Sequence, residues 1–191
     1  MIGDEVFIVG DTSGTDDTLA RVVRVDARRT TLRRTADDTD PYERVVVANA
    51  DRLVIVTALA DPEPRPRMVD RCLVAAYDAG MQPLLVLTKA DLTDPAGFLG
   101  AYAPLDVPYV VTRRDGDTVL GLDEVREAVS GLRSVLVGHS GVGKSTLVNA
   151  LVPGTGRLTG HVNEVTGRGR HTSTSAVALR LPPAGHLQGA G

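Results

Sequence analysis

Short apolar runs alternate with amphipathic stretches along most of the chain. Apolar runs long enough only for buried strands lie at 53–57, 84–87, 109–112 and 135–137. Between these runs the apolar residues recur at helical spacing. The helices predicted from this spacing cover 68–79, 94–101, 122–129 and 144–151. Because strands that alternate with helices form βαβ units, the pattern predicts an α/β fold with a parallel sheet and helices on both faces.

The two ends of the chain depart from this pattern. Residues 1–48 contain short apolar runs separated by turn-rich sequence and are predicted to be rich in β-strands. Residues 153–175 are rich in Gly, Thr and Arg without periodicity, which is typical of a long loop that is either functional or disordered. Residues 176–181 alternate weakly and predict one more strand, and 182–191 are predicted to be an irregular tail.

Composition narrows the class of protein. Apolar residues make up 42% of the 191 residues and aromatic residues only 3%, so the core must consist of aliphatic side chains, as parallel sheets favour. The net charge of −3 does not by itself require a nucleic-acid or membrane partner. The single cysteine, Cys72, excludes an intrachain disulfide and a cysteine-rich zinc site. Without a signal peptide or an apolar run of ~18 residues, we expect a cytoplasmic, monomeric protein without a membrane partner.

One segment carries the complete pattern of a phosphate-binding loop. Gly138-His-Ser-Gly-Val-Gly-Lys-Ser145 fits G-x-x-x-x-G-K-[ST] and lies between a predicted strand and a predicted helix. The glycines allow backbone N–H groups to point at phosphates, and the helix N-terminus adds partial positive charge. Lys144 is expected to reach the outer phosphates and Ser145 to bind Mg²⁺. The predicted phosphate-binding residues are Gly138, His139, Ser140, Gly141, Val142, Gly143, Lys144, Ser145 and Thr146.

A second motif, Thr88-Lys-Ala-Asp91, follows the predicted strand at 84–87. The Asp91 carboxylate can accept hydrogen bonds from N1 and N2 of guanine, two donors that adenine lacks. The stem of Lys89 can lie along the purine face, and Thr88 and Ala90 complete the predicted guanine-binding set. Alone, the motif also fits an ordinary turn at a strand end. Beside a phosphate loop in one βαβ chain, both loops are expected at the same edge of the sheet.

The order of the two motifs is unusual. The guanine motif precedes the phosphate loop by fifty residues, the reverse of ordinary GTPases. Chain termini often lie close together, so a circular permutation can move the ends and preserve the site. After the phosphate loop, Gly167-Arg-Gly-Arg-His-Thr-Ser-Thr174 lies where a switch loop is expected. A threonine there can bind Mg²⁺ and His171 can orient or deprotonate water, although a flexible basic loop fits the sequence equally well.

Arginines gather in the β-rich part of the chain, beside Asp26 as the one acid among them. Two interpretations are open: a solvated strand face, or a surface that contacts a phosphate backbone. The residues concerned are Arg21, Arg24, Arg28, Arg29, Arg33 and Arg34.

Together, T-K-A-D, G-H-S-G-V-G-K-S and G-R-G-R-H-T-S-T resemble the motifs of the circularly permuted GTPase family that depends on the small ribosomal subunit (RsgA). The resemblance runs from about residue 1 to 181, and 44–51 is similar to the junction between that family's OB barrel and GTPase domain. It implies a partial, RNA-binding OB-fold at 1–48, a permuted P-loop GTPase domain at 49–181, and an irregular tail at 182–191.

The resemblance also implies a function and a set of site residues. It implies a GTPase that uses Mg²⁺ with GTP or GDP and acts in late maturation of the small ribosomal subunit, with 16S rRNA as a partner. It suggests His171 as the catalytic residue and Thr174, with Thr172 as second choice, as the Mg²⁺-binding switch threonine. It makes the arginine cluster a candidate rRNA-contact surface, and it places a guanine-backing loop near 112–114, where the usual Ser-Ala signature is absent.

The sequence departs from the family pattern in three places. The opening strands of the barrel are missing, so that 1–48 hold about three of five strands. The D-x-P-G motif, which holds Mg²⁺ through water and contacts the γ-phosphate, is absent, as is the zinc-binding domain. We therefore expect a truncated chain in which 153–191 are weakly anchored, the phosphate-loop strand has an open edge, and hydrolysis is weak.

Three classes of function stay open at this point. The first is a GTPase of small-subunit assembly, and the second is a non-catalytic fragment that binds guanine nucleotides or rRNA. The third is a P-loop kinase that uses ATP, against which Asp91 argues, because adenine would leave its carboxylate unpaired.

Overall fold

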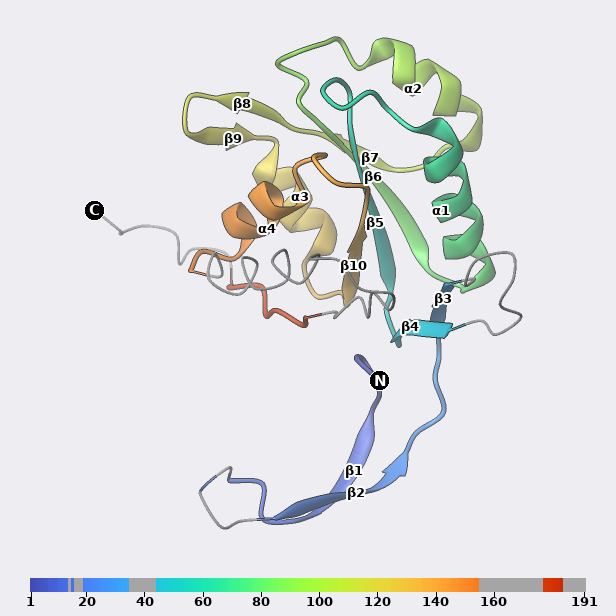
Figure 1. Cartoon of the computed structure of the whole chain (residues 1–191), viewed down its shortest axis with the longest axis vertical. Helices are drawn as coiled ribbons and strands as arrows, with labels where there is room; N and C mark the ends of the chain where they lie inside the picture. Colours follow the sequence, from blue (N-terminus) through green and yellow to red (C-terminus); the bar gives the residue numbers. More distant parts are fainter. Residues whose placement is uncertain (14, 16–18, 35–43, 155–176, 184–191) are drawn as a thin grey trace, which may run out of the picture.

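The computed structural model describes residues 1–13, 15, 19–34, 44–154 and 177–183, and its centre is a parallel sheet of four strands. The strands lie in the order β10–β5–β6–β7 (Figure 1). Their bounds are Arg52–Ala58 for β5, Gln82–Thr88 for β6, Tyr109–Val111 for β7 and Ser134–Val137 for β10. All three pairings are parallel, so the α/β architecture predicted from the sequence is confirmed.

Helices cover both faces of this sheet. Their bounds are Pro66–Asp78 for α1, Ala96–Tyr102 for α2, Leu122–Val129 for α3 and Lys144–Leu151 for α4, with a short 3₁₀ turn, η1, at Ala103–Leu105. Helices α1 and α2 lie on one face, and α3 and α4 lie on the other (Figure 1). None of the helices within the described ranges is long and apolar enough to span a membrane.

The central strands are apolar at consecutive positions because both of their faces are covered. On one face, α1 and α2 pack against Leu53, Ile55, Leu85 and Leu87. On the other, α3 and α4 pack against Val54, Val56, Leu84 and Val86. Side chains of a strand point to opposite faces in turn, so each strand contributes to two separate apolar clusters.

The β-rich start of the chain forms two small antiparallel sheets. One pairs β1 (Val6–Gly10) with β2 (Ala20–Val25), and the other pairs β3 (Thr31–Arg34) with β4 (Arg44–Ala48). Every residue of β1 and β2 is exposed, and this hairpin extends away from the body of the molecule (Figure 1). In the second sheet, Leu32 and Val47 join the core cluster of α1. The assignment of this region to an OB-type barrel stays a prediction.

Asn49 and Asp51 join the start of the chain to the parallel sheet. The Asn49 side chain donates to the Gly3 carbonyl (2.9 Å) and accepts from the Arg29 backbone N–H (2.7 Å). Asp51 accepts from the Arg133 backbone N–H (2.9 Å) and from the Arg29 guanidinium (3.1 Å). These hydrogen bonds lower the pKa of Asp51, and the bond from Arg133 has the largest effect. Contacts between residues far apart in sequence therefore fix where the first strands meet the sheet.

Two features of the fold differ from the sequence predictions. An additional hairpin, β8 (Arg113–Asp115) and β9 (Thr118–Leu120), follows β7. The strand predicted at 176–181 is wrong for its described part: 177–181 lie in no strand and instead line an apolar groove beside β10 and α4. Within the described residues, β10 pairs with β5 alone, as expected for an open edge. Weak alternation does not make a strand when no neighbour supplies backbone hydrogen bonds.

Candidate nucleotide site

The phosphate loop connects β10 to α4, as the motif requires. Lys144 is the first residue of α4, and its Nζ donates to the carbonyl oxygens of Gly138 and His139, both at 2.7 Å. The ammonium thus folds back over the loop, half-buried, and burial lowers its pKa. Ser145 and Thr146 follow on the first turn and are exposed. The backbone N–H groups of that turn have no partners within the helix, so they are available to an anion.

Two glycines of the loop occupy positions that a side chain would disturb. Gly143, the N-cap of α4, has φ +91°, a left-handed conformation that L-residues rarely adopt. At Gly138 a Cβ would lie 2.4 Å from the backbone oxygen of Val56 on the neighbouring strand. The loop can therefore lie against β5 only because glycine stands at this point.

Gly138→Ala is expected to lower the free energy of unfolding by roughly 1 to 3 kcal/mol, because the new methyl group must displace backbone. Gly97→Ala on α2 is the matched control: a Cβ there meets nothing within 4 Å, and stability should stay the same or rise slightly. Urea unfolding of both variants checks this. Equal unfolding free energies for the two variants would show that the close approach to Val56 does not constrain the loop.

The guanine motif begins at the end of β6 and contacts the phosphate loop directly. Thr88 is buried, and its Oγ1 donates to the Val142 carbonyl at 2.7 Å. Gly143 faces the same threonine, since a Cβ built on it would lie 3.7 Å from Thr88 Oγ1. The two motifs, fifty residues apart in the chain, thus lie side by side at the carboxyl edge of the sheet. In an open α/β sheet this is the edge where ligands bind.

The Asp91 carboxylate is exposed and held in place by backbone. Its Oδ1 accepts from the Arg114 N–H at 2.9 Å, and the Ala90 N–H donates to the Thr112 carbonyl at 3.2 Å. The bond from Arg114 is the main cause that lowers the pKa of Asp91, so the group is ionised at neutral pH. The segment 112–114 therefore lies against the guanine motif, and its role as the guanine-backing loop, which the resemblance implied, stays a prediction.

Lys89 stands in the left-handed region at φ +61°, and its Nζ donates to the backbone carbonyl of Asp61. This contact joins the guanine motif to the loop that precedes α1. Because the ammonium is hydrogen-bonded to the backbone, the aliphatic part of the Lys89 side chain lies beside the motif, where a purine ring can stack on it.

The hairpin that supports Asp91 is the part of this site that was not predicted. A signal for it exists in the sequence: Gly116-Asp117 is a two-residue turn of the kind that closes tight hairpins, and Gly116 has φ +58°. The flanking strands are only three residues long, and β8 is fully exposed, so hydrophobic alternation gives no indication of them.

Mg²⁺ is the metal that a phosphate loop implies. The Ser145 hydroxyl is a hard oxygen ligand beside Lys144, at the place where such an ion would meet the outer phosphates. No group of three or more His, Cys, Asp or Glu side chains that could hold a metal occurs in the described ranges. These residues fit Mg²⁺, which typically takes one or two protein ligands and fills its other positions with phosphate oxygens and water. The second predicted ligand, Thr174, lies outside the described residues, as do Thr172 and His171.

The arginine cluster does not act as one free surface. Arg28 pairs with Asp4 (Nε–Oδ1 2.7 Å), and Arg29 pairs with Asp51 (3.1 Å). The hydrogen bond from Arg28 holds the pKa of Asp4 well below its usual range. Arg21 is exposed on β2, and Arg24 lies over the Phe7 ring at 3.7 Å while it pairs with Asp26. The pair with Asp4 closes the base of the β1–β2 hairpin, and the pair with Asp51 attaches the segment after β2 to the parallel sheet.

A parallel α/β sheet with a phosphate loop and a T-K-x-D loop in contact at one edge defines the class: a P-loop guanine-nucleotide-binding protein, here with the motif order permuted. The family model described as RsgA GTPase matches residues 25–188. The chain belongs to the RsgA GTPase family.

Curated relatives and solved structures agree with this assignment. The chain is 47% identical over 146 residues to the small ribosomal subunit biogenesis GTPase RsgA of Pseudomonas aeruginosa (strain LESB58), covering 74% of this chain and 43% of the relative. It is 46% identical over 149 residues to the RsgA of Azotobacter vinelandii, covering 74% of this chain and 42% of that protein.

Two crystal structures share the fold. YjeQ from Thermotoga maritima has a TM-score of 0.60 at 30% identity and covers 80% of this chain and 51% of its own. YloQ, described as a circularly permuted GTPase, has a TM-score of 0.55 at 27% identity, and the match covers 79% of this chain and 50% of YloQ. The chain thus spans about half the length of the proteins that it matches.

Proposed function

We propose that this chain binds GDP and GTP with Mg²⁺ and that its nucleotide cycle serves maturation of the small ribosomal subunit in the cytoplasm. The observation that carries the proposal is the contact of Thr88 with Val142, which brings the guanine motif and the phosphate loop to one edge of the sheet. The similarity to curated small-subunit biogenesis GTPases supports the choice of partner.

Each residue has a defined part in nucleotide binding. Lys144, released from the carbonyls of Gly138 and His139, would bind the outer phosphates, together with the N–H groups of the first turn of α4. Asp91 would accept hydrogen bonds from N1 and N2 of guanine. One would go to Oδ2, and the other to Oδ1, which also accepts from the Arg114 backbone N–H. When bound through Ser145, Mg²⁺ would neutralise phosphate charge.

For rRNA, the geometry favours Arg21 and Arg24 on the exposed hairpin as contacts over Arg28 and Arg29. Arg24 also has an acidic partner, Asp26, but that carboxylate is 40% exposed. The partners of Arg28 and Arg29, Asp4 and Asp51, are only 7% and 26% exposed, so a phosphate replaces those two ion pairs less easily. Arg24, stacked on Phe7, presents an aromatic and a guanidinium together, a combination that suits both unpaired bases and phosphates. Arg33 and Arg34 stay part of the proposed contact set.

Hydrolysis requires a group that orients the attacking water and a switch threonine that binds Mg²⁺. We propose His171 as the group that orients water and Thr174 as the Mg²⁺-binding threonine of the switch. Within the described residues, β10 has one unpaired edge beside the phosphate loop. This edge favours a second candidate function, a guanine-nucleotide-binding and rRNA-binding protein with weak turnover.

Nucleotide turnover separates these two functions. We expect GDP to bind saturably, while release of phosphate from GTP stays slow and responds little to purified small ribosomal subunits. Lys144→Ala is the matched control for contaminating GTPases, because it removes the phosphate contact and keeps the rest of the chain. A strong stimulation by small subunits that Lys144→Ala abolishes would establish the GTPase and refute the weak-turnover candidate.

A further inference from the structure

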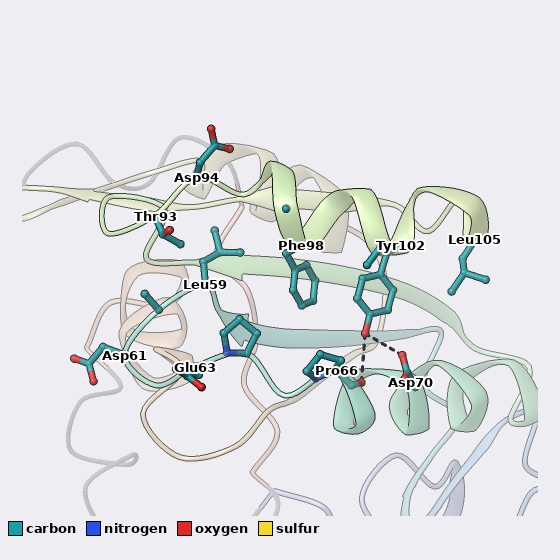
Figure 2. Close-up of a pocket in the computed structure, with 14 residues that line it drawn as sticks. Leu59, Asp61, Glu63, Pro66, Asp70, Thr93, Asp94, Phe98, Tyr102 and Leu105 are labelled. Carbon is teal, nitrogen blue, oxygen red and sulfur yellow. Dashed lines mark hydrogen bonds between the residues drawn. The ribbon is translucent and has the colours of Figure 1, made fainter.

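A groove of about 790 Å³ lies between α2 and the loop that leads into α1. Its walls come from 59–66, from Asp70 on α1, and from 93–105. Figure 2 shows the labelled side chains in a row that runs from Asp61 and Asp94 at one end to Leu105 at the other. None of the residues assigned above to nucleotide or rRNA binding lines this groove.

The floor of the groove is apolar and fixed. The rings of Phe98 and Tyr102 stack with their centroids 4.8 Å apart. The Tyr102 hydroxyl donates to Asp70 Oδ1 at 2.9 Å and lies 3.3 Å from the Pro66 carbonyl, so it joins α2 to α1 (Figure 2). Burial and the neighbouring Asp70 carboxylate raise the pKa of Tyr102, which keeps this donor protonated. A partner would therefore meet a surface that is already formed, which lowers the entropic cost of binding.

The groove has a negative rim. Four carboxylates line the groove: Asp61, Glu63, Asp70 and Asp94. The lining contains no Lys, Arg or His. Lys89 lies at the Asp61 end of the groove, where its ammonium donates to the backbone carbonyl of Asp61. Such a surface repels phosphates and attracts cationic side chains. The charge of the lining residues favours a basic occupant over a nucleic acid.

Exposed apolar side chains lie on α1 and at the end of the groove. Asp70, Val74 and Tyr77 share one face of α1, since they are spaced four and three residues apart. Val74 is 68% exposed and Tyr77 57%, and Leu105, at the end of the groove, is 54% exposed. Exposed apolar side chains beside a polar rim typically mark a protein interaction site, and an elongated groove suits a polypeptide better than a compact small molecule.

We propose that this groove binds a basic, apolar segment of a partner protein. Its apolar side chains would lie on Phe98 and Leu105, and its Arg or Lys side chains would face Glu63 and Asp94. The proposal is independent of the nucleotide site, because it shares no residue with that site.

A binding titration with the full chain tests it. A fluorescent peptide of alternating Arg and Leu is titrated at low salt, beside a matched peptide with Glu in place of Arg. The double variant Glu63→Gln with Asp94→Asn should weaken binding of the Arg peptide about tenfold, since it removes two rim charges. Asp78→Asn with Glu127→Gln removes the same charge from exposed sites outside the groove and should leave binding unchanged.

Steric blockage gives a second, independent variant. Gly97 lines the groove, and a Cβ there meets nothing within 4 Å, so Gly97→Trp introduces an indole into the groove from a position that tolerates a Cβ. It should abolish binding of the Arg peptide while the circular-dichroism spectrum and unfolding midpoint stay as in the parent. The proposal is overturned if the Arg peptide does not bind, if all variants bind it equally, or if the Glu peptide or a short single-stranded RNA binds this groove as well.

Discussion

Replacing Asp91 with asparagine is expected to weaken GDP binding by about a hundredfold or more and to remove the preference for guanine over adenine. The asparagine carries no charge, and its amide NH₂ donates where the carboxylate accepted, so the variant loses one hydrogen bond to the base and the charge that strengthens the other. Arg114 holds the carboxylate in place and keeps it ionised at neutral pH, so the parent protein has the full acceptor. Calorimetric titration of the parent and the variant with GDP and ADP measures both effects.

Xanthine nucleotides provide a control that separates loss of contact from loss of fold. Xanthine has a carbonyl at C2, where guanine has an amino group, and the asparagine amide can donate to this carbonyl. Asp91→Asn should therefore bind xanthosine diphosphate more tightly than GDP, the reverse of the parent. If the variant keeps the affinity and the base preference of the parent, Asp91 does not contact the base.

Lys144→Ala is expected to weaken binding of GDP and GTP by about a hundredfold, through loss of the one ammonium positioned over the loop. The structure gives Lys144 two partners in the loop, the carbonyls of Gly138 and His139 at 2.7 Å. The substitution thus removes both the cation for the phosphates and two hydrogen bonds that hold the loop. Fluorescence titration with a labelled GDP measures the loss.

Guanosine and Lys144→Arg are the controls for this variant. Guanosine has no phosphates, so its weak binding should be the same for Lys144→Ala and the parent. Lys144→Arg keeps the charge, but the planar guanidinium does not fit a space closed by two carbonyls, and it should restore little of the affinity. Full affinity of Lys144→Ala for GDP would show that the outer phosphates lie elsewhere.

The parallel sheet was predictable because its strands are buried on both faces. The consecutive apolar residues of β5 and β6 leave few alternatives to a strand between two helical layers, and the observed bounds differ from the predicted ones by one or two residues. The phosphate loop and T-K-A-D were predictable for another reason: their chemistry requires particular residue types at fixed spacing. The resemblance to the RsgA family added the meaning of their reversed order, and the family match confirms it.

Other features depend on contacts between distant residues, which no local pattern contains. The pairing of Arg28 with Asp4 and of Arg29 with Asp51 brings together residues more than twenty positions apart. Thr88 reads as an ordinary strand end until the fold places Val142 beside it. The acidic groove likewise forms only when α2 packs on α1 through Tyr102 and Asp70. The positions of the arginines along the sequence could not show which of them pair with the less exposed carboxylates of Asp4 and Asp51.

Calorimetric titration of the 191-residue chain with GDP and, separately, with ADP tests the central claim most directly. The account predicts one GDP per chain and an affinity for ADP that is lower by about a hundredfold or more, since adenine leaves the Asp91 carboxylate unpaired. Equal affinities for GDP and ADP, or no binding of either, would contradict a site in which Lys144 and Asp91 bind the two ends of one nucleotide.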